Sequence, residues 1–285
     1  MAAPRQVRGQ VLTLRRVGAY RAMTVVAPGV PIEFRPGHFV SIAVGGAGTS
    51  MMLRRAFSIH EADPSGMYGG TIEFVFAVCG PGTSWLATRR PGDTLDVVGP
   101  LGRPFALPRE PVHCVLVGGG YGSAPLFPLA EMLRGRGCRV DFVLGARTAD
   151  RVFGERRAAR TSDSATLTTE DGTLGVAGRV IDVLPRVLVD TEADAVYACG
   201  PMPMLRAVAA IASDRGLPSQ VAVEESMACG FGVCMTCVLP VVGRDSVTRM
   251  VRSCVEGPVF RGDRVRWDRI GTIPEDAIGA GGARP

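Results

Sequence analysis

Four cysteines near the end of the sequence are the residues best suited to do chemistry together. Cys229, Cys234 and Cys237 follow the spacing C-x4-C-x2-C, and Cys254 follows later in RSCVEGPVF. Plant-type [2Fe-2S] sites use this spacing. Structural zinc sites more often use paired C-x2-C knuckles, and this segment holds one such pair. The pattern therefore favours an iron–sulfur site, with structural zinc as the alternative.

Two glycine-containing turns upstream are suited to bind a nucleotide. In VLVGGGYGSAPL an apolar strand leads through glycines into a helix, and in YACGPMPML a second strand ends before another helix. Glycines let a pyrophosphate approach the backbone, and a helix N-terminus offers free N–H groups. The spacing departs from G-x-G-x-x-G, so a plain tight turn is the alternative interpretation. The candidate residues are Gly118, Gly119, Gly120, Gly122, Cys199, Gly200, Pro201 and Met202.

Two earlier loops offer further groups for binding a phosphate or a polar ring. LRRAFSIH contains Arg55, which suits a phosphate, and Ser58, which suits the polar edge of a ring. CGPGTSWL contains Gly82 and Thr83 just before a short predicted helix, an arrangement that can form a phosphate-binding nest. Taken singly, each pattern is weak evidence, because exposed arginines are usually only solvated and GPGT is usually only a turn.

The segments that carry these residues differ in sequence pattern. Residues 5–107 hold short β-branched runs separated by Gly and Pro turns, which predicts an all-β barrel or sandwich. Residues 108–220 alternate apolar strands with helical stretches, which predicts a doubly wound parallel sheet. Short strands are expected around the cysteines in 221–268, and a flexible tail in 269–285. The glycine turns would lie at the carboxyl edge of the predicted sheet, where ligands bind.

Composition limits the classes of function. The net charge of +5 comes entirely from arginine, because the sequence contains no lysine, and this excludes Schiff-base and P-loop lysines. The arginines are scattered, which gives no support for nucleic-acid binding. No apolar run reaches the ~18 residues that span a bilayer, and the N-terminal residues lack the apolar core of a signal peptide. We therefore expect a cytoplasmic protein without membrane contact.

Together these motifs resemble those of the ferredoxin-reductase family of flavoproteins. The family's flavin motif R-x-[FY]-[ST] is matched by residues 55–58 and its G-x-G-T loop by residues 80–83. Its nucleotide motifs GGGxGxAP and CGPxPM are matched by residues 118–125 and 199–204. The resemblance implies a multidomain α+β fold, with an antiparallel FAD barrel, a doubly wound NAD-binding domain and a small β-rich [2Fe-2S] module. It implies FAD contacts from Arg55, Ala56, Phe57, Ser58, Val75, Phe76, Ala77, Gly82 and Thr83.

Within that family, the C-terminal motifs are similar to those of electron-transfer subunits of NAD-dependent dihydroorotate dehydrogenases. EESMACGFGVCMTC and CVEGPVF match the [2Fe-2S] module of these subunits, although Ala56 replaces a frequent Pro and the last cysteine interval is slightly long. The resemblance implies a partner, an FMN-containing dihydroorotate dehydrogenase catalytic subunit, in a heterotetramer with two chains of each kind. Electrons would then run from FMN through the cluster and FAD to NAD+ in pyrimidine biosynthesis.

Two other functions fit the same motifs. One is a flavin/[2Fe-2S] subunit of a hydrogenase, a sulfide dehydrogenase or a ferredoxin:NADP oxidoreductase, and the other is a zinc-stabilised nucleotide-binding module without redox turnover. No acid or base catalyst is predicted, since His38, His60 and His113 are isolated in the sequence. The preference for NAD over NADP comes from the resemblance, because no ribose-binding carboxylate or 2′-phosphate arginine can be assigned from the sequence.

Overall fold

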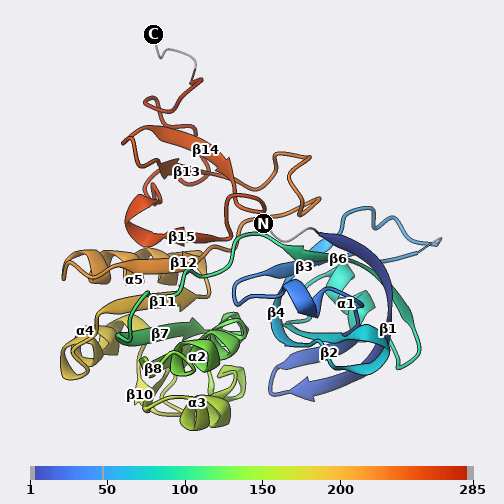
Figure 1. Ribbon diagram of the computed structural model, residues 1–285, viewed down its shortest axis with the longest axis horizontal. Coiled ribbons are helices and arrows are strands. Elements are labelled where there is room, and N and C mark those ends of the chain that lie inside the picture. The colour runs from blue at the N-terminus through green and yellow to red at the C-terminus, as the bar shows by residue number, and fades with distance from the viewer. Residues whose placement is uncertain (1–3, 47, 281–285) are drawn as a thin grey trace.

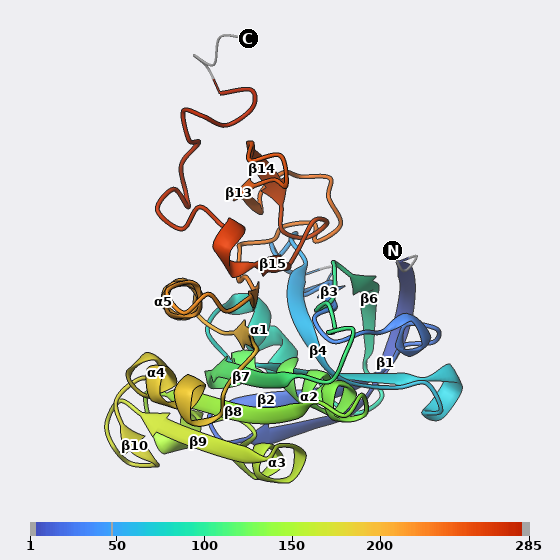
Figure 2. The same cartoon turned by 60° about the vertical axis from the view of Figure 1, so that its left-hand side comes forward.

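The computed structural model describes residues 4–46 and 48–280, which fold into three connected parts (Figure 1). A barrel formed by the N-terminal third lies beside a sheet covered by helices. A smaller C-terminal part stands at one end of the molecule, as a second view also shows (Figure 2). No helix within the described residues is long and apolar enough to cross a bilayer.

The barrel is closed by antiparallel pairing of neighbouring strands. Inward-facing apolar residues such as Val11, Met23 and Phe74 are fully buried in its core, as expected when every second residue of a strand points inside. Helix α1 (Pro81–Ala87) adds Leu86 to this core. In order around the barrel the strands are β1 (Arg5–Val17), β2 (Tyr20–Val26), β5 (Thr71–Phe76), β4 (Arg55–Asp63), β3 (Phe39–Ile42) and β6 (Thr94–Leu101).

The second part is a mostly parallel sheet between two layers of helices. Helices α2 (Leu126–Arg134) and α3 (Glu155–Thr161) cover the face toward the barrel, and α4 (Val180–Asp190) and α5 (Met202–Ser213) cover the other face. The apolar strands are buried from both sides, which is typical of parallel sheets. In spatial order the strands are β10 (Val176–Ala177), β9 (Ser164–Thr169), β8 (Arg139–Ala146), β7 (His113–Gly119), β11 (Ala195–Cys199), β12 (Ser219–Ala222) and β15 (Val259–Arg261).

The C-terminal part combines a hairpin with a strand that joins the large sheet. The hairpin pairs β13 (Val238–Val242) with β14 (Thr248–Arg252), whereas β15 pairs antiparallel with β12. The first three cysteines of the motif lie in the irregular loop between β12 and β13, the cysteine loop. Short 3-10 helices complete the fold: η1 (Pro31–Glu33), η2 (Met67–Gly69), η3 (Gly120–Ser123), η4 (Ala149–Arg151) and η5 (Gly262–Arg264).

The predicted fold class is confirmed, but several elements differ from expectation. The sequence analysis missed the strands and helices between residues 150 and 190, because β9 is polar and α4 contains Pro185. The expected boundary between residues 220 and 221 falls inside β12. Within the described part of the predicted flexible tail 269–285, most residues are exposed, but Ala277 is fully buried and the Ile278 N–H donates to the Thr248 carbonyl over 3.0 Å. Residues 281–285 lie outside the described range.

Candidate functional site

A cavity of about 350 Å³ opens where the three parts of the molecule meet. Eight of the nine residues predicted to contact a flavin line this flavin cavity, and Gly82 is the exception. Residues from the nucleotide-binding part and from the segment before the cysteines complete it, and the sequence analysis had assigned no role to most of these. Its lining comprises Phe39, Arg55, Ala56, Phe57, Ser58, Val75, Phe76, Ala77, Cys79, Thr83, Tyr121, Gly122, Ala124, Val223, Glu224, Glu225, Ser226, Met227 and Pro258.

The barrel strands fix the side chains on one side of this cavity. Strand β4 carries the Arg55–Ser58 motif between β3 and β5, and Phe57 stacks on Phe74 with ring centroids 4.9 Å apart. Gly82 lies so close to Arg55 that a Cβ atom there would come within 2.9 Å of the guanidinium Nε. The glycine therefore lets the helix start approach the arginine, and the two can bind one anionic group together.

Thr83 holds the turn that precedes α1. Its hydroxyl oxygen accepts hydrogen bonds from the backbone N–H groups of Cys79 (3.0 Å) and Gly80 (3.1 Å). This is the half of a capping box in which the side chain of the third helical residue bonds to the backbone N–H of the N-cap residue. The predicted phosphate loop thus starts the helix instead of preceding it, since Gly82 and Thr83 are already helical.

A second cavity, of about 470 Å³, lies along the carboxyl edge of the parallel sheet. Of the predicted nucleotide-binding residues, Gly119, Gly120 and Pro201 line it. Tyr121 lines both this cavity and the flavin cavity. The complete lining is Tyr20, Gly119, Gly120, Tyr121, Gly145, Ala146, Arg147, Arg151, Glu170, Arg179, Val180, Ile181, Pro201, Pro203 and Met204.

The other predicted nucleotide-binding residues pack the two turns together. A Cβ atom on Gly122 would lie 2.7 Å from Gly200 Cα, so both residues must be small for the turns to meet. Gly118 pairs with Cys199 across β7 and β11. Burial raises the pKa of the Cys199 thiol well above its usual value, and the nearby Glu224 adds to the effect. Met202 packs beside the core on the far face of the sheet and lines neither cavity.

Charged side chains at the second cavity are ones that the sequence analysis did not assign. Arg147 follows β8, Arg151 ends η4, and Arg179 precedes α4. Glu170 directly follows β9, at the carboxyl edge of the sheet. A carboxylate at this edge is suited to accept hydrogen bonds from ribose hydroxyls. Its signal in the sequence was hidden because β9 itself was not recognised.

The four cysteines of the motif lie close together as two pairs. By exposure they form an outer pair, Cys229 and Cys234, and a buried inner pair, Cys237 and Cys254. Within the described residues, no three cysteine, histidine or carboxylate side chains converge on one point, as a single metal ion would require. Two pairs of thiols match the four-cysteine ligation of a two-iron cluster. The four thiols therefore fit a [2Fe-2S] cluster.

Each cysteine of the outer pair accepts a hydrogen bond on its sulfur. The Val233 N–H donates to Cys229 Sγ over 3.4 Å, and the Thr236 hydroxyl lies 3.2 Å from Cys234 Sγ. The hydrogen bond from Thr236 lowers the pKa of Cys234 to about 6. A lowered pKa favours the thiolate, which is the form of cysteine that binds metals.

The inner pair packs directly against the barrel beside the flavin cavity. Cys237 and Cys254 are each only 2% exposed and form one apolar cluster with Phe39 and Leu101. Ala56 and Met227 pack against the same cluster, and together with Phe39 they also line the flavin cavity. The cysteines and the flavin cavity thus share a wall. In contrast, Cys234 faces solvent.

A carboxyl group also faces the flavin cavity. The exposed Glu224 lines this cavity, and desolvation by the surrounding protein raises the pKa of its carboxyl. Tyr121 lines the same cavity, and burial raises the pKa of this phenol to about 12. Glu224 belongs to the EESMACG stretch, where the sequence analysis considered only the cysteines.

Solved reductases share this fold. A solved NADH-dependent reduced ferredoxin-NADP oxidoreductase covers 92% of this chain and 91% of its own, with 29% identity and a TM-score of 0.79. A ferredoxin NADP+ reductase from Neisseria gonorrhoeae shares the fold, with 18% identity, a TM-score of 0.62 and coverage of 74% of this chain and 92% of its own. Fold and site therefore define an oxidoreductase of the ferredoxin-reductase type that carries an iron–sulfur module.

Sequence comparison identifies the particular family. Residues 224–266 match the iron–sulfur cluster binding domain of dihydroorotate dehydrogenase B. The electron transfer subunit of dihydroorotate dehydrogenase B (NAD(+)) from Bacillus caldolyticus is 41% identical over 81% of this chain and 86% of the relative. The subunit from Desulforamulus reducens is 32% identical over 85% of this chain and 90% of the relative. The chain belongs to this family of electron transfer subunits.

Proposed function

We propose that this chain carries electrons between a dihydroorotate-oxidising partner subunit and NAD+, with FAD and a [2Fe-2S] cluster as its redox groups. The shared wall of Phe39, Ala56 and Met227 carries the proposal, because it separates Cys237 and Cys254 from the flavin cavity by a single layer of side chains. Electron transfer needs such closeness between centres. The curated relatives carry the corresponding name.

The chain's own residues position the groups. Bound FAD supplies the conversion between hydride transfer at a nicotinamide and one-electron transfer at an iron–sulfur centre. Arg55 and the start of α1 would bind its phosphates, while Phe57, Ser58 and the residues 75–77 would enclose its ring system. The four cysteines Cys229, Cys234, Cys237 and Cys254 would hold the cluster, which supplies a one-electron relay.

The second cavity would bind NAD. Gly119, Gly120 and Pro201 present backbone close to a pyrophosphate, and the arginines at its rim suit the negative charge of the dinucleotide. Glu170 would accept hydrogen bonds from the adenosine ribose and repel a 2′-phosphate. NAD is accordingly preferred over NADP, although Arg147, Arg151 and Arg179 offer charge of the opposite sign.

The outer face of the cysteine loop would contact the partner. Phe231, Val233 and Met235 are exposed around the exposed Cys234, so large apolar side chains surround the outer thiol pair. Clustered apolar residues on a surface often mark a protein interface. We propose that the FMN-containing catalytic subunit binds here, in a heterotetramer of two chains of each kind. Because the thiolate ligands require reducing conditions, we propose a cytoplasmic location.

Reconstitution with the catalytic subunit tests the proposal. The chain should purify with flavin absorption, iron and acid-labile sulfide, and dihydroorotate should reduce its flavin only when the partner is present. NADH alone should reduce the flavin directly. A colourless protein that contains zinc would reject the redox function. Flavin and cluster without reduction by dihydroorotate in the complex would reject the assigned partner.

A second candidate is supported by the structural comparison alone. The NADH-dependent ferredoxin-NADP oxidoreductase superposes over nearly the whole chain, which keeps a ferredoxin-linked role compatible with the fold. Its 29% identity is lower than the 41% to the dihydroorotate dehydrogenase subunit. Reduction of ferredoxin by the isolated chain with NADPH, and no response to the catalytic subunit, would favour this candidate.

A further inference from the structure

One short segment forms the wall between the two cavities. Residues 119–121 line the second cavity, which we propose binds NAD, whereas Tyr121, Gly122 and Ala124 line the flavin cavity. The separation between a nicotinamide and a flavin therefore depends on where this segment lies. Hydride transfer is highly sensitive to such positions, since a shift of about 1 Å can cost on the order of 100-fold in rate.

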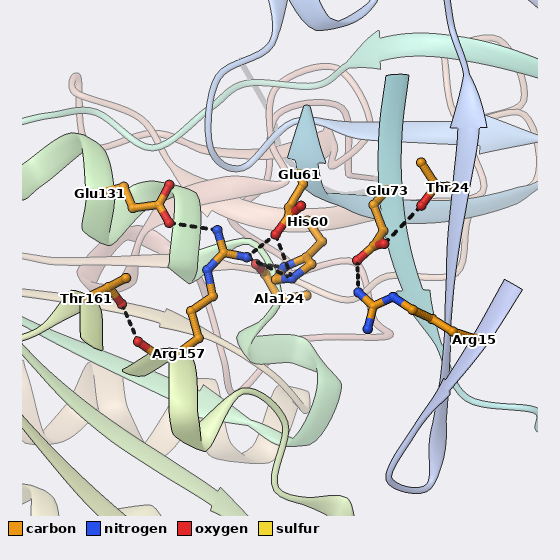
Figure 3. Close-up of polar contacts among 9 residues, drawn as sticks. All are labelled: Arg15, Thr24, His60, Glu61, Glu73, Ala124, Glu131, Arg157 and Thr161. Carbon is orange, nitrogen blue, oxygen red and sulfur yellow. Dashed lines mark hydrogen bonds and ion pairs between the residues drawn. The ribbon is translucent and has the colours of Figure 1, made fainter. Parts of the chain in front are cut away.

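His60 ties the end of this segment to the barrel. Its Nδ1 atom lies 2.8 Å from the carbonyl oxygen of Ala124, and its side chain is almost completely buried (Figure 3). His60 is on β4, two residues beyond Ser58 of the flavin motif. The hydrogen bond therefore connects the flavin-binding strand with the nucleotide-binding loop across 64 residues of sequence.

Pro128 explains why the Ala124 carbonyl needs this partner. Ala124 lies two residues before α2, but it and Pro125 already have right-handed helical backbone angles, so its carbonyl is placed to accept the N–H of the residue four positions later. For Ala124 that residue is Pro128, which has no N–H. The imidazole of His60 supplies the donor that the helix lacks. The tie is thus built into the start of α2 by its own sequence.

Arg157 fixes the proton of His60 on the correct nitrogen. Arg157 Nη1 lies 3.1 Å from His60 Nε2, and a guanidinium can only donate. Nε2 must therefore accept, so the neutral imidazole carries its proton on Nδ1 and donates it to Ala124. The pKa of His60 is lowered by burial and by Arg157, with Ala124, Glu61 and Glu73 acting in the opposite direction.

Arg157 also spans the boundary between barrel and sheet. From α3 it donates to Glu61 on β4 over 2.5 Å and to Glu131 on α2 over 2.7 Å (Figure 3). Phe127 and Phe153 enclose the imidazole edge-to-face, with ring centroids 5.8 and 5.2 Å away. The contact between His60 and Arg157 is therefore fixed by residues of the barrel and of the part that contains the large sheet.

We propose that His60 and Arg157 form a latch that sets the position of the nucleotide-binding loop relative to the flavin-binding strand. The two are positioning residues for hydride exchange between NAD and FAD. This inference rests on the proposed function, because it assumes that both cofactors bind in the two cavities. The latch residues themselves line neither cavity and touch neither cofactor site.

Substitutions of His60 separate the two halves of the latch in the full-length, FAD-loaded chain. His60→Asn keeps a donor at the place of Nδ1, and His60→Gln keeps an acceptor at the place of Nε2. We expect His60→Gln and His60→Leu to slow flavin reduction by NADH roughly 10- to 100-fold, with the NAD+ dissociation constant changed less than about threefold. The rate of flavin reduction in His60→Asn should stay within about threefold of the rate in the unaltered chain. The rate in Arg157→Gln should lie between those of His60→Asn and His60→Leu.

A spectroscopic signature and a rescue distinguish positioning from simple stability. The long-wavelength absorbance of reduced flavin stacked with NAD+ should fade in His60→Leu and persist in His60→Asn. Adding Pro128→Ala to His60→Leu gives the Ala124 carbonyl a partner within the helix, which should restore the thermal midpoint but not the absorbance. Arg15→Gln, which breaks an ion pair with Glu73 between two barrel strands, is the matched control: it can lower the thermal midpoint but should leave the absorbance unchanged.

Three outcomes are decisive. Unaltered rate and absorbance in His60→Leu and His60→Gln would overturn the latch. Full recovery of the absorbance in the Pro128→Ala double variant would also overturn it, since His60 would then act on stability alone. Failure of NADH to reduce the flavin of the unaltered chain would instead contradict the proposed function, which keeps the two conclusions separate.

Discussion

The flavin cavity and the cysteine loop are neighbours, but the fold supports them differently. Strands β3, β4 and β5 build the cavity, and they belong to a closed barrel with a fully buried core. The cysteine loop has no regular structure between β12 and β13. It is tied instead by single contacts, such as the Ser41 hydroxyl to the Cys229 carbonyl (3.0 Å) and Arg252 to the Gly232 carbonyl (2.8 Å).

This difference indicates how each site depends on its ligand. The cavity walls are stabilised by the barrel, so the shape of the flavin site exists before the flavin binds. The loop carries three of the four cysteines, of which Cys234 is exposed and Cys229 half-buried. Metal binding in such a loop contributes directly to its folding free energy. We therefore expect changes in the loop to affect the cluster first, and changes in the barrel to affect the flavin first.

The largest expected effect comes from removing a cluster ligand. Cys234→Ser should abolish iron and sulfide incorporation and electron transfer from the partner, while NADH still reduces the flavin. Metal analysis and stopped-flow absorbance measure the two effects. Cys138→Ser, at a buried cysteine outside the motif, should keep the full iron content. Loss of NADH-to-flavin transfer in Cys234→Ser would show that the cavity also depends on the cluster, against the comparison.

A substitution in the barrel should weaken FAD binding and leave the cluster unchanged. Arg55→Gln removes a charged donor from the flavin cavity, and charged hydrogen bonds contribute about 1.5–3 kcal/mol. FAD affinity, measured by fluorescence titration, should fall by roughly 10- to 100-fold, with iron content unchanged. Arg186→Gln, at an exposed arginine of α4, serves as the control. Equal losses of iron and flavin in Arg55→Gln would argue against separate support of the two sites.

Acid should weaken the barrel through His38. This residue precedes Phe39 of the shared wall, and its Nδ1 accepts a hydrogen bond from the Arg35 N–H (3.1 Å). Burial lowers the pKa of His38 to about 4, against about 6.5 when unfolded. Because the unfolded chain then binds the extra proton, stability is lost as pH falls below about 6.5, by about 2 kcal/mol at pH 5.

Chemical unfolding followed by tryptophan fluorescence at pH 7 and pH 5 measures this loss. His38→Gln retains an acceptor without a titrating ring, so the loss between the two pH values should shrink by about 2 kcal/mol. Glu224 and Glu225, whose pKa values are raised, contribute in the opposite direction, and the comparison with His38→Gln removes their effect. An identical pH dependence in both chains would exclude His38 as the cause.

The smallest expected effect concerns the backbone of the cysteine loop. Gly230 has a φ of 84°, and a Cβ there would lie 3.0 Å from the side chain of Ser41. Gly230→Ala should therefore cost about 1–2 kcal/mol locally and lower the iron content while flavin content stays constant. Gly216→Ala has a similar φ of 69° but open space around it, and controls for the backbone strain alone. Equal iron content in both variants would remove the role of the Ser41 contact.

Local patterns predicted much of this molecule. The barrel strands are short β-branched runs between Gly and Pro turns, and the four cysteines keep a spacing that favours an iron–sulfur site. The turn at Gly122 and the turn at Gly200 could be expected to meet because both follow strands of one parallel sheet. Each of these features is encoded in a short stretch of the sequence, and so are most of the predicted flavin-site residues.

Features that depend on distant segments could not be predicted. Glu170 was missed because β9 is too polar to be recognised as a buried strand. Glu224 and Tyr121 reach the flavin cavity from the C-terminal part and from η3, and only the packing of the three parts brings them there. The contact of His60 with Ala124 likewise needs the full fold, because nothing in LRRAFSIH indicates a partner in the helix beginning at residue 126.

The pairing of β15 with β12 has a consequence for how this family can be divided. A chain shortened to end after β12, at residue 222, would lose not only the four cysteines of the motif but also the outermost strand of the sheet. The backbone N–H and C=O groups of β12 would then be free to pair with another molecule, which promotes aggregation. The iron–sulfur segment therefore cannot be removed without exposing an edge of the large sheet. Chimeras that exchange it should carry residues 259–261 along with the cysteines.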